Sequence, residues 1–257
     1  MVRGVAVAGR RASGGVTVRI KLGRFTVALL GMVGGAALAT EPLVFNTEDY
    51  PPFNYERPSG RVSGISTEIL REAAERAEVD ATFRMQPWAR SYAMAQRQAG
   101  HCVYSTSRTD EREDAFTWVG PLADNDWAVF ARPDADIQIN DLEDLHDYRV
   151  GGFRDDATTQ YLESRGIDVA TVSRDSVNAR LLSVGRIDLW ATGGRVAPWL
   201  AEREGAGEVE ALHVFRQVDL YLACHPDTPA ATLEALQEAL DEMRADGAMQ
   251  SIRDDYG

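Results

Sequence analysis

Residues 104–112, Tyr-Ser-Thr-Ser-Arg-Thr-Asp-Glu-Arg, combine the side chains best suited to holding an anion. Serine and threonine hydroxyls and two arginines, Arg108 and Arg112, follow a strand predicted at 101–105. A guanidinium stays charged at physiological pH and can donate two parallel hydrogen bonds to one carboxylate. Both arginines could instead pair with neighbouring acids, an interpretation that suits one of them better than both. The segment therefore predicts an anion-binding loop.

Aromatic residues supply candidate walls for the same site. Tyr50 and Phe53 follow a strand predicted at 43–47, and Trp88 follows one at 81–85. Stacking or cation–π contact with a ligand is one role for aromatic residues at such positions. For Trp88, packing of the following helix against the core is an equally good explanation.

No pattern in the sequence indicates covalent or metal chemistry. The chain has no Gly-x-Ser-x-Gly elbow, HExxH motif, P-loop or paired-cysteine metal motif, and its four histidines fall away from the loops expected to bind a ligand. We therefore predict no catalytic residue, no metal and no cofactor. A carboxylate base, Glu48 or Asp49, is the alternative that the sequence leaves open.

Strand-like and helix-like segments alternate after the N-terminal region, a pattern typical of α/β proteins with parallel sheets. Two extended stretches, near 127–132 and 217–221, divide the segments into two series and suit two crossovers between lobes. Ligands of open α/β sheets bind beyond the carboxyl ends of the strands, so we expect the site on the loops that follow them. The predicted strands are 43–47, 81–85, 101–105, 116–119, 149–153, 168–172, 188–191 and 220–225, and the predicted helices are 65–79, 87–98, 158–164, 176–184, 196–202, 228–244 and 247–255.

The first 39 residues have the composition of an export signal. Basic residues, with no acidic ones, precede an apolar run at 25–39 that ends in Ala37-Leu38-Ala39, a small-residue cleavage pattern. The run is short and rich in glycine for a membrane span, and a retained anchor is the alternative. The formal net charge is −13 at pH 7, and the part after the signal is more acidic still. This acidity argues against nucleic acid or anionic lipid as partners.

Cys102 and Cys224 are the only cysteines in the sequence. In an exported chain, two cysteines are a candidate disulfide. Two buried thiols that act as small hydrophobic residues are the alternative. The sequence alone leaves both possibilities open.

Several short motifs recur in a recognisable order along the chain. They are Tyr50-Pro51-Pro52-Phe53, Gly60, Gly64, Ser105, Ser107, Arg112, Phe116, Pro121, Thr158-Thr159-Gln160, Gly185-Arg186-Ile187-Asp188 and the segment 243–247. In this order they resemble the family 3 bacterial extracellular solute-binding proteins, which serve polar amino acid importers of the ABC class. Each motif is weak alone, but the ordered set covers more than 200 residues and is specific.

The resemblance implies a two-lobed, periplasmic-binding-protein-like α/β fold of type II, in which two open sheets are joined by two crossover segments and close like a hinged clamp. It implies a signal peptide at 1–39, a first lobe at 40–128 plus 219–257, and a second lobe at 129–218. In that topology the strand 220–225 lies antiparallel beside 101–105, so that Cys102 and Cys224 could pair.

The resemblance also implies a function. We expect a monomeric periplasmic protein that captures a small anionic or zwitterionic, amino-acid-like ligand and delivers it to an ABC permease. In the family, the arginine matched here by Arg112 binds the ligand's α-carboxylate. The expected ligand-binding residues are Arg112, Ser105, Ser107, Thr158, Thr159, Tyr50, Phe53 and Trp88.

Two departures from the family pattern bear on the ligand. Where amino-acid binders carry an aspartate for the ligand's α-ammonium, this chain has Gly193, and the family's first-strand acid position falls at Thr47. Either another acid takes over, with Glu48 and Asp49 next in the chain, or the ligand is not an ordinary α-amino acid. Arg195 could then favour a second anionic group, as in a dicarboxylate.

Two other functions remain as alternatives. A dehydratase that acts on cyclic acids would need a positioned acid or base in the crevice, because the fold alone does not fix the function. A free-standing sensor would capture a ligand in the same way and dock onto a membrane receptor. A turnover screen on cyclohexadienyl acids would separate the enzyme from a binding protein.

Overall fold

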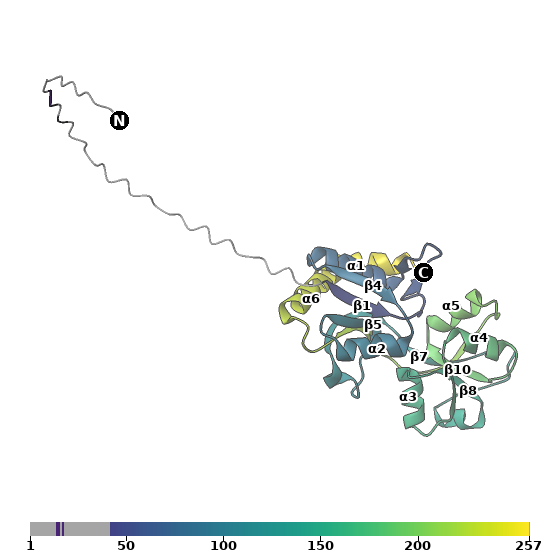
Figure 1. The fold of residues 1–257 in the computed structure, drawn as a ribbon. Helices are drawn as coiled ribbons and strands as arrows, with labels where there is room; N and C mark the ends of the chain where they lie inside the picture. The colour runs from purple at the N-terminus through teal and green to yellow at the C-terminus, as the bar shows by residue number, and fades with distance from the viewer. Residues whose placement is uncertain (1–13, 16, 18–41, 257) are drawn as a thin grey trace, which may run out of the picture. The chain divides into compact units, whose positions relative to one another are not determined.

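The computed structural model describes residues 42–256 together with Gly14, Gly15 and Thr17. Apart from these three residues, the export signal expected at 1–39 lies outside the described residues. Within 42–256, two five-stranded sheets and a two-stranded hairpin contain the strands, and each large sheet carries its own helices (Figure 1). We call each large sheet with its helices a lobe. The expected two-lobed α/β fold is confirmed.

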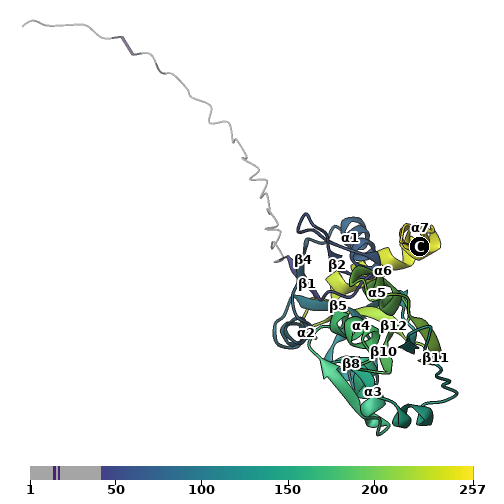
Figure 2. The same cartoon turned by 90° about the vertical axis from the view of Figure 1, so that its right-hand side faces the viewer.

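The first lobe combines the beginning and the end of the described chain. Its strands, from edge to edge, are β4 (Ala81–Met85), β1 (Leu43–Thr47), β5 (His101–Ser107), β12 (Asp219–Cys224) and β6 (Thr117–Asp124). Its helices are α1 (Ile65–Arg76), α2 (Trp88–Arg97), α6 (Ala230–Ala245) and α7 (Ala248–Asp254). β1 is parallel to β4 and β5, whereas β12 is antiparallel to β5 and β6. Helices α1, α6 and α7 lie together on one face and α2 lies on the other (Figure 2).

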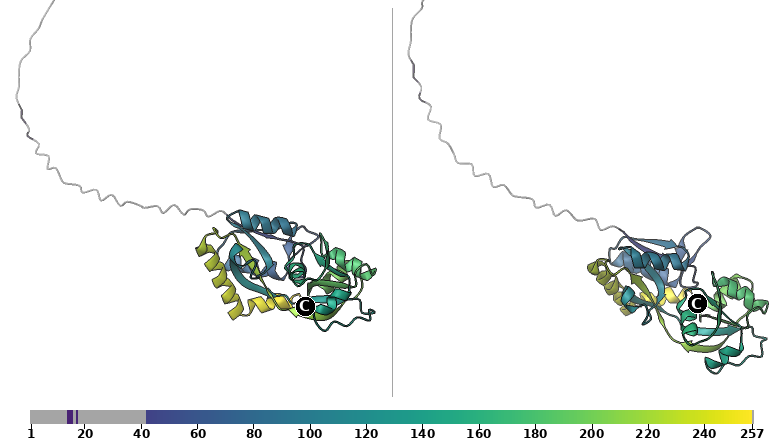
Figure 3. Two further views of the ribbon diagram at one scale, coloured as in Figure 1. Left: turned by 90° about the horizontal axis from the view of Figure 1, so that it is seen from below. Right: turned by 60° about the horizontal axis from the view of Figure 1, so that its bottom comes forward.

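The second lobe is built from the middle of the chain. Its strands, from edge to edge, are β11 (Glu210–Arg216), β7 (Trp127–Ala131), β10 (Leu189–Gly193), β8 (Val150–Phe153) and β9 (Val169–Val172). Its helices are α3 (Ala157–Ser164), α4 (Ser176–Ser183) and α5 (Val196–Arg203). Helix α3 packs on one face of the sheet, and α4 and α5 pack on the other. In both views of Figure 3 the yellow C-terminal helices lie beside the blue elements of the first lobe.

Two crossover segments join the lobes, as expected for this fold. β6 ends at Asp124 in the first lobe and β7 begins at Trp127 in the second, so the chain crosses at 125–126. It crosses back at 217–218, between β11 and β12. The stretch expected as an extended crossover near 127–132 is mostly β7, a fully buried strand.

Two features of the fold are absent from the sequence prediction. β11 lies at the edge of its sheet, and its residues are exposed or half-buried. Two register shifts against β7 also break the alternation of inward and outward side chains, which hides the strand from a search for period two. The other feature is the short hairpin of β2 (Tyr55–Glu56) and β3 (Val62–Ser63), whose strands are too brief to give a pattern.

Gly64 fixes how the chain enters α1 beside the loop that follows β1. Its φ of 122° belongs to a region that favours glycine. A Cβ at this position would also lie 2.4 Å from the carbonyl oxygen of Phe53. Only glycine therefore lets the 50–54 loop pack this closely against the start of α1.

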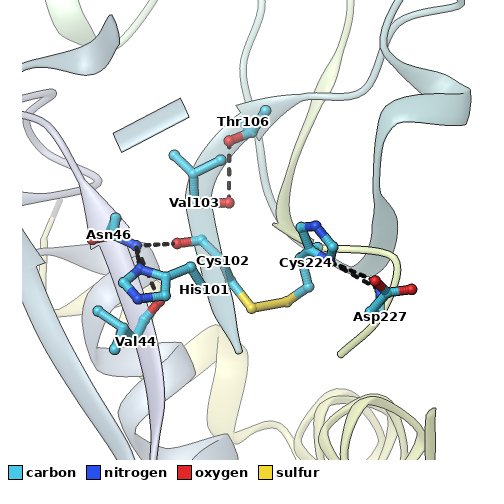
Figure 4. Close-up of a disulfide and its surroundings, with 9 residues drawn as sticks. Val44, Asn46, His101, Cys102, Val103, Thr106, Cys224 and Asp227 are labelled. Atoms are coloured by element: carbon cyan, nitrogen blue, oxygen red, sulfur yellow. Dashed lines mark hydrogen bonds and ion pairs between the residues drawn. A yellow bond between two sulfur atoms is a disulfide. The ribbon is translucent and has the colours of Figure 1, made fainter. Parts of the chain in front are cut away.

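Cys102 and Cys224, whose state the sequence leaves open, form a disulfide (Figure 4). They are direct partners in the antiparallel pairing of β5 with β12, and both are buried. Beside them, the Asn46 side chain in β1 donates a hydrogen bond of 2.9 Å to the carbonyl oxygen of Cys102. The bond joins β12 to the start of β5, while the segment expected to bind an anion includes and follows the end of β5.

Candidate functional site

The expected binding residues lie at the ends of parallel strands in both lobes. Trp88 and Arg112 of the first lobe reach the second lobe, where both contact Asp155 in the loop between β8 and α3, and Arg112 also contacts Gln160 in α3. The carboxyl ends of the strands in the two sheets therefore meet, as expected for a ligand crevice between open sheets. The residues are Tyr50 and Phe53 after β1, Trp88 at the start of α2, Ser105 and Ser107 at the end of β5, Arg112 in the loop after it, and Thr158 and Thr159 in the first turn of α3.

The Arg112 side chain is buried and has no carboxylate partner among the described residues. Only 6% of the residue is exposed, and its guanidinium lies 5.5 Å from the ring centre of Trp88 and 5.3 Å from that of Tyr92. Nη2 donates hydrogen bonds to Gln160 Oε1 at 3.3 Å and to the Asp155 carbonyl oxygen at 3.5 Å, both neutral acceptors at long distance. A buried charge without a counter-ion is costly, so this guanidinium is suited to binding an external anion.

Arg108, the other arginine of the segment, is paired with an acid at the surface. Its Nε donates to Glu113 Oε2 at 2.7 Å, and its Nη2 donates to the other carboxylate oxygen of Glu113. Both side chains are about half exposed, with 40% and 46% of their surface accessible. The surface-pairing interpretation therefore holds for Arg108 and fails for Arg112.

Ser105 is placed by an irregularity in the sheet. Tyr104 pairs with Leu222 and Thr106 with Tyr221, which leaves Ser105 as the extra residue of a β-bulge. Its φ of 56° lies in the left-handed region, which non-glycine residues rarely adopt. The hydroxyl is buried and has no hydrogen-bond partner within residues 42–256. A strained residue with an unsatisfied hydroxyl, next to a buried arginine loop, is typical of a binding site.

Thr158 and Thr159 differ in where their side chains lie. The backbone N–H of Thr158 donates to Asp156 Oδ2 at 2.9 Å, so the aspartate caps α3. The Thr158 hydroxyl is buried without a partner in the described part of the chain. The Thr159 hydroxyl lies against β8, where a Cβ on Gly152 would be 2.4 Å from it. Thr159 therefore packs on the second sheet, and its hydroxyl, like that of Thr158, has no hydrogen-bond partner within the described residues.

The expected aromatic walls also fall into two groups. Trp88 is buried under Arg112, and its Nε1 donates to the Asp155 carbonyl oxygen at 3.1 Å, which ties α2 to the second lobe. Phe53 is 1% exposed and belongs to the core, stacked on Tyr50 with 5.8 Å between ring centres. Trp88 therefore lies at the contact between the two lobes, whereas Phe53 is a core residue that stacks on Tyr50.

Gly193, the position without the family's aspartate, is closely covered. A Cβ on Gly193 would lie 2.4 Å from Asn125 Oδ1 and 2.7 Å from the Tyr50 hydroxyl oxygen. These two side chains are themselves joined, because Asn125 Nδ2 donates to the Tyr50 oxygen at 3.2 Å. The Tyr50–Asn125 pair thus occupies the space that a side chain at position 193 would need.

Acidic side chains converge on the same region. Burial raises the pKa of Glu48 well above its usual value, and the charges of Asp156, Asp175 and Asp49 add to the effect, while Arg112 acts in the opposite sense. Burial and the charge of Asp156 likewise raise the pKa of Tyr50. The Glu48 carboxylate therefore lies within the field of acids from both lobes and of the buried arginine.

Asp175 has an internal structural role in this group. Its carboxylate accepts hydrogen bonds from Thr192 Oγ1 at 2.6 Å, Trp190 Nε1 at 2.9 Å and Asn178 Nδ2 at 3.0 Å. Burial nevertheless raises its pKa to about 6, because three neutral donors do not fully replace lost hydration. These three hydrogen bonds hold the carboxyl end of β10 beside α4.

A second set of contacts joins the lobes beside the crevice. Arg203 on α5 donates to both carboxylate oxygens of Asp49, at 2.9 and 2.6 Å. One turn earlier on α5, the Trp199 ring lies 5.2 Å from the ring of Tyr55, and the Arg203 guanidinium lies 5.2 Å from the Trp199 ring. We call these four residues the α5 clasp. The lobes are thus held together on this side by side chains alone.

Sequence reasoning missed several residues of this region. Glu48 is named in the sequence analysis only as an alternative, either as a carboxylate base or as an acid beside Thr47, and Asn125, Asp156 and Gln160 are not singled out as site residues. Glu48 and Asp156 both follow strands, a position that could have marked them. Asn125 lies in a crossover, and no local pattern indicates its contact with Gly193.

Two features are absent from the described residues. No group of three or more side chains suited to metal binding occurs there. None of the helices described is both long enough and apolar enough to span a bilayer.

Comparison with known proteins agrees with the geometry. Residues 43–257 match the family model described as bacterial extracellular solute-binding proteins, family 3. ABC transporter arginine-binding protein 1 of Escherichia coli (strain K12) is 25% identical over 237 residues, which are 89% of this chain and 96% of the relative. The L-cystine-binding protein TcyJ of the same strain is 21% identical over 210 residues, which are 80% and 79% of the two chains.

Solved structures show the same fold. A histidine kinase sensor domain similar to periplasmic binding proteins has a TM-score of 0.78 and 22% identity, over 84% of this chain and 96% of its own. The ancestral amino acid-binding protein AncCDT-1, a precursor of cyclohexadienyl dehydratase, has a TM-score of 0.73 and 19% identity, over 84% and 94%. Because the family model covers nearly all of the described fold, the chain belongs to the bacterial extracellular solute-binding proteins, family 3.

Proposed function

We propose that this protein captures a small, carboxylate-bearing, amino-acid-like molecule between its lobes and carries out no chemistry on it. The observation that carries the proposal is Arg112, a buried guanidinium that lies against the neighbouring rings of Trp88 and Tyr92 and has only neutral hydrogen-bond acceptors. A ligand carboxylate would supply the missing counter-charge in a site shielded from water. The arginine-binding and cystine-binding relatives support an amino acid as the class of ligand.

Capture in the open state would use Arg112 together with Ser105 and Ser107. Closure would then bring Thr158, at the start of α3, onto the same anion. The buried, unpartnered hydroxyls of Ser105 and Thr158 support this assignment, because each lacks the hydrogen bond that a buried polar group requires. Thr159 would act by holding α3 against β8.

The remaining parts of the proposal concern cellular context. We place a cleaved export signal at 1–39, with the protein acting as a monomer in the periplasm. The boundary expected after residue 128 moves to the crossover at 125–126, because β7 begins at Trp127 in the second sheet. The closed form would deliver the ligand to an ABC permease. The family and the ABC transporter relative support this role.

A thermal-shift screen tests the proposal. The panel would contain the L-amino acids, L-cystine, polyamines, opines and dicarboxylates. A ligand at a hundred times its Kd stabilises the folded state by about 2.7 kcal/mol, which raises Tm measurably. We expect at least one amino-acid-like carboxylate to raise Tm. No shift with any carboxylate, or a shift with polyamines alone, would contradict the proposal.

A second candidate is a dehydratase of cyclic acids, which the position of Glu48 favours. Its carboxyl group, with a raised pKa and the Arg112 charge nearby, has the properties of a general acid beside an anion-binding group. Incubation with cyclohexadienyl acids, followed by ultraviolet detection of an aromatic product, tests this function. Turnover that disappears in Glu48→Gln would establish it, and tight binding without turnover supports the binding protein.

A further inference from the structure

The last residue of β8, in the second lobe, packs against the first lobe. Phe153 is buried, and it belongs to a hydrophobic cluster whose other buried members all come from the first lobe. These members are Trp88, Ala95, Val103, Phe116 and Ala223. Separating the lobes would return the Phe153 ring to water, so this contact opposes opening.

A hydrogen bond between the lobes lies two residues further along the chain. Trp88 Nε1 donates to the Asp155 carbonyl oxygen at 3.1 Å, and Arg112 Nη2 donates to the same oxygen at 3.5 Å. A carbonyl oxygen has two lone pairs and can accept both. Because the Arg112 contact is long, the indole N–H is the stronger donor, and it can keep the bond when a ligand takes the arginine.

The backbone of Asp155 is a second, independent sign of a special role. Its φ is 62°, in the left-handed region, although the residue is not glycine and its side chain is exposed. Non-glycine residues rarely adopt this conformation, and they keep it where the surrounding structure holds them, often at functional sites. Here the contact that reaches Asp155 from the other lobe is made to its backbone oxygen.

We infer that Trp88 is a positioning residue, whose indole N–H holds the two lobes together through the Asp155 carbonyl oxygen. We call Trp88, Phe153 and Asp155 the β8 latch. The effect of the latch on ligand affinity rests on the proposed function, whereas its effect on the lobes does not. Trp88 then acts on every ligand alike, through closure, and not by stacking on the ligand.

The size of the effect follows from the bond that is lost. If the ligand is held by the closed form, the apparent Kd is the intrinsic Kd divided by the closed fraction. Removing one neutral hydrogen bond that exists only in the closed form should lower the closed population relative to the open one by about threefold to tenfold. The apparent Kd rises by up to the same factor.

X-ray scattering of the ligand-free protein tests the latch without any ligand. Trp88→Phe keeps an aromatic ring and removes the N–H, so we expect its radius of gyration to exceed that of the wild type. Trp118→Phe is the matched control, because Trp118 Nε1 donates to the Glu113 carbonyl oxygen at the same 3.1 Å within the first lobe. It should leave the radius unchanged. A cooperative thermal transition checks that each variant folds.

The α5 clasp also ties the lobes, and it shares no residue with the latch. Both tryptophan variants are therefore measured a second time in the Arg203→Gln background, where the clasp is broken. We expect Trp88→Phe to increase the radius further there and Trp118→Phe to add nothing.

Calorimetry with L-arginine, L-glutamine and L-cystine gives the second readout. Each probe that binds the wild type should bind Trp88→Phe more weakly by one common factor, of about threefold to tenfold, and should bind Trp118→Phe as it binds the wild type. Full affinity in Trp88→Phe, or a factor that differs from probe to probe, overturns the effect through closure, because direct contact with the ligand depends on the ligand's side chain.

The outcomes separate this inference from the proposed function. Equal radii of Trp88→Phe and Trp118→Phe in both backgrounds overturn the latch, and a probe that binds the wild type leaves the proposed function standing. If no probe binds the wild type, that result counts against the proposed function, and the radii of the ligand-free proteins still decide whether the latch exists.

Discussion

Replacing Gly193 with alanine should destabilise the protein far more than an ordinary glycine-to-alanine change. The new Cβ would lie 2.4 Å from Asn125 Oδ1, 2.7 Å from the Tyr50 hydroxyl and 3.0 Å from Val196 Cγ2. Overpacking in a buried region costs about 1–3 kcal/mol, and displacing the Tyr50–Asn125 hydrogen bond adds about 1 kcal/mol. We therefore expect the free energy of unfolding, measured with urea, to fall by about 2–4 kcal/mol.

Gly194→Ala is the matched control, because its Cβ would meet the nearest atom, the carbonyl oxygen of Asp126, at 3.4 Å. This ordinary contact predicts a change of roughly 1 kcal/mol or less. Removing the obstruction with Asn125→Ala should recover part of the cost of Gly193→Ala, seen as coupling in a double-mutant cycle. Equal stability of the two alanine variants would refute the explanation of why position 193 carries no acid.

Three further predictions concern the rest of the molecule. Reducing the disulfide, which closes a loop with a sequence separation of 122, should lower the free energy of unfolding by up to about 5 kcal/mol in the loop-entropy picture; an unchanged Tm in reductant contradicts this. The pKa of Asp175 is raised from 3.8 to about 6, so the folded state holds this proton more tightly than the unfolded chain and its contribution to stability falls as pH rises through that interval, by about 3 kcal/mol in total. Urea titrations at pH 4.5 and 7 should show this fall in the free energy of unfolding for the wild type and a smaller one for Asp175→Asn. An equal fall in the two proteins would contradict the assignment of the raised pKa to Asp175. Arg203→Gln, which breaks the pair with Asp49, should increase the radius of gyration of the ligand-free protein in X-ray scattering, whereas Arg180→Gln, which breaks a pair within the second lobe, should not; identical radii argue against the α5 clasp as a tie between lobes.

The sequence was sufficient for the architecture because the signals that determine it are local. Buried strands such as 43–47 and the apolar face of the first helix can be seen in short windows, and the ordered motifs added the two-lobed topology. The sequence does not predict strand β11, because its register shifts and its exposed position at the sheet edge remove the alternation that short windows detect. The buried strand β7 resembles a crossover in the sequence because it stands alone between the two series of alternating strands and helices.

Only the part of the candidate site around Arg112 could be predicted from the sequence. A local run of hydroxyls and arginines indicates Arg112, and its guanidinium is covered in part by the adjacent rings of Trp88 and Tyr92. The rest of the site depends on contacts between distant parts of the chain. The absence of an acid at Gly193 was visible in the sequence, but its physical cause, Asn125 in a crossover, requires the folded arrangement.

The same limit applies to Glu48. The charges of Asp156 and Asp175, which belong to the other lobe, act on its carboxyl group. Both of these acids have hydrogen-bond partners of their own, which only the folded structure shows. Charges that act across a cleft leave no signature in the local sequence around either member.

The most direct test of this account is calorimetry of Arg112→Gln beside Arg108→Gln, with the carboxylate that gives the largest Tm shift in the wild type. Both variants remove one positive charge from the same loop, yet only Arg112 is buried and without an acid. Loss of a bidentate, charge-assisted contact predicts at least about hundredfold weaker binding for Arg112→Gln. Binding by Arg108→Gln should match the wild type. Equal affinities in the two variants would contradict a ligand carboxylate held by Arg112.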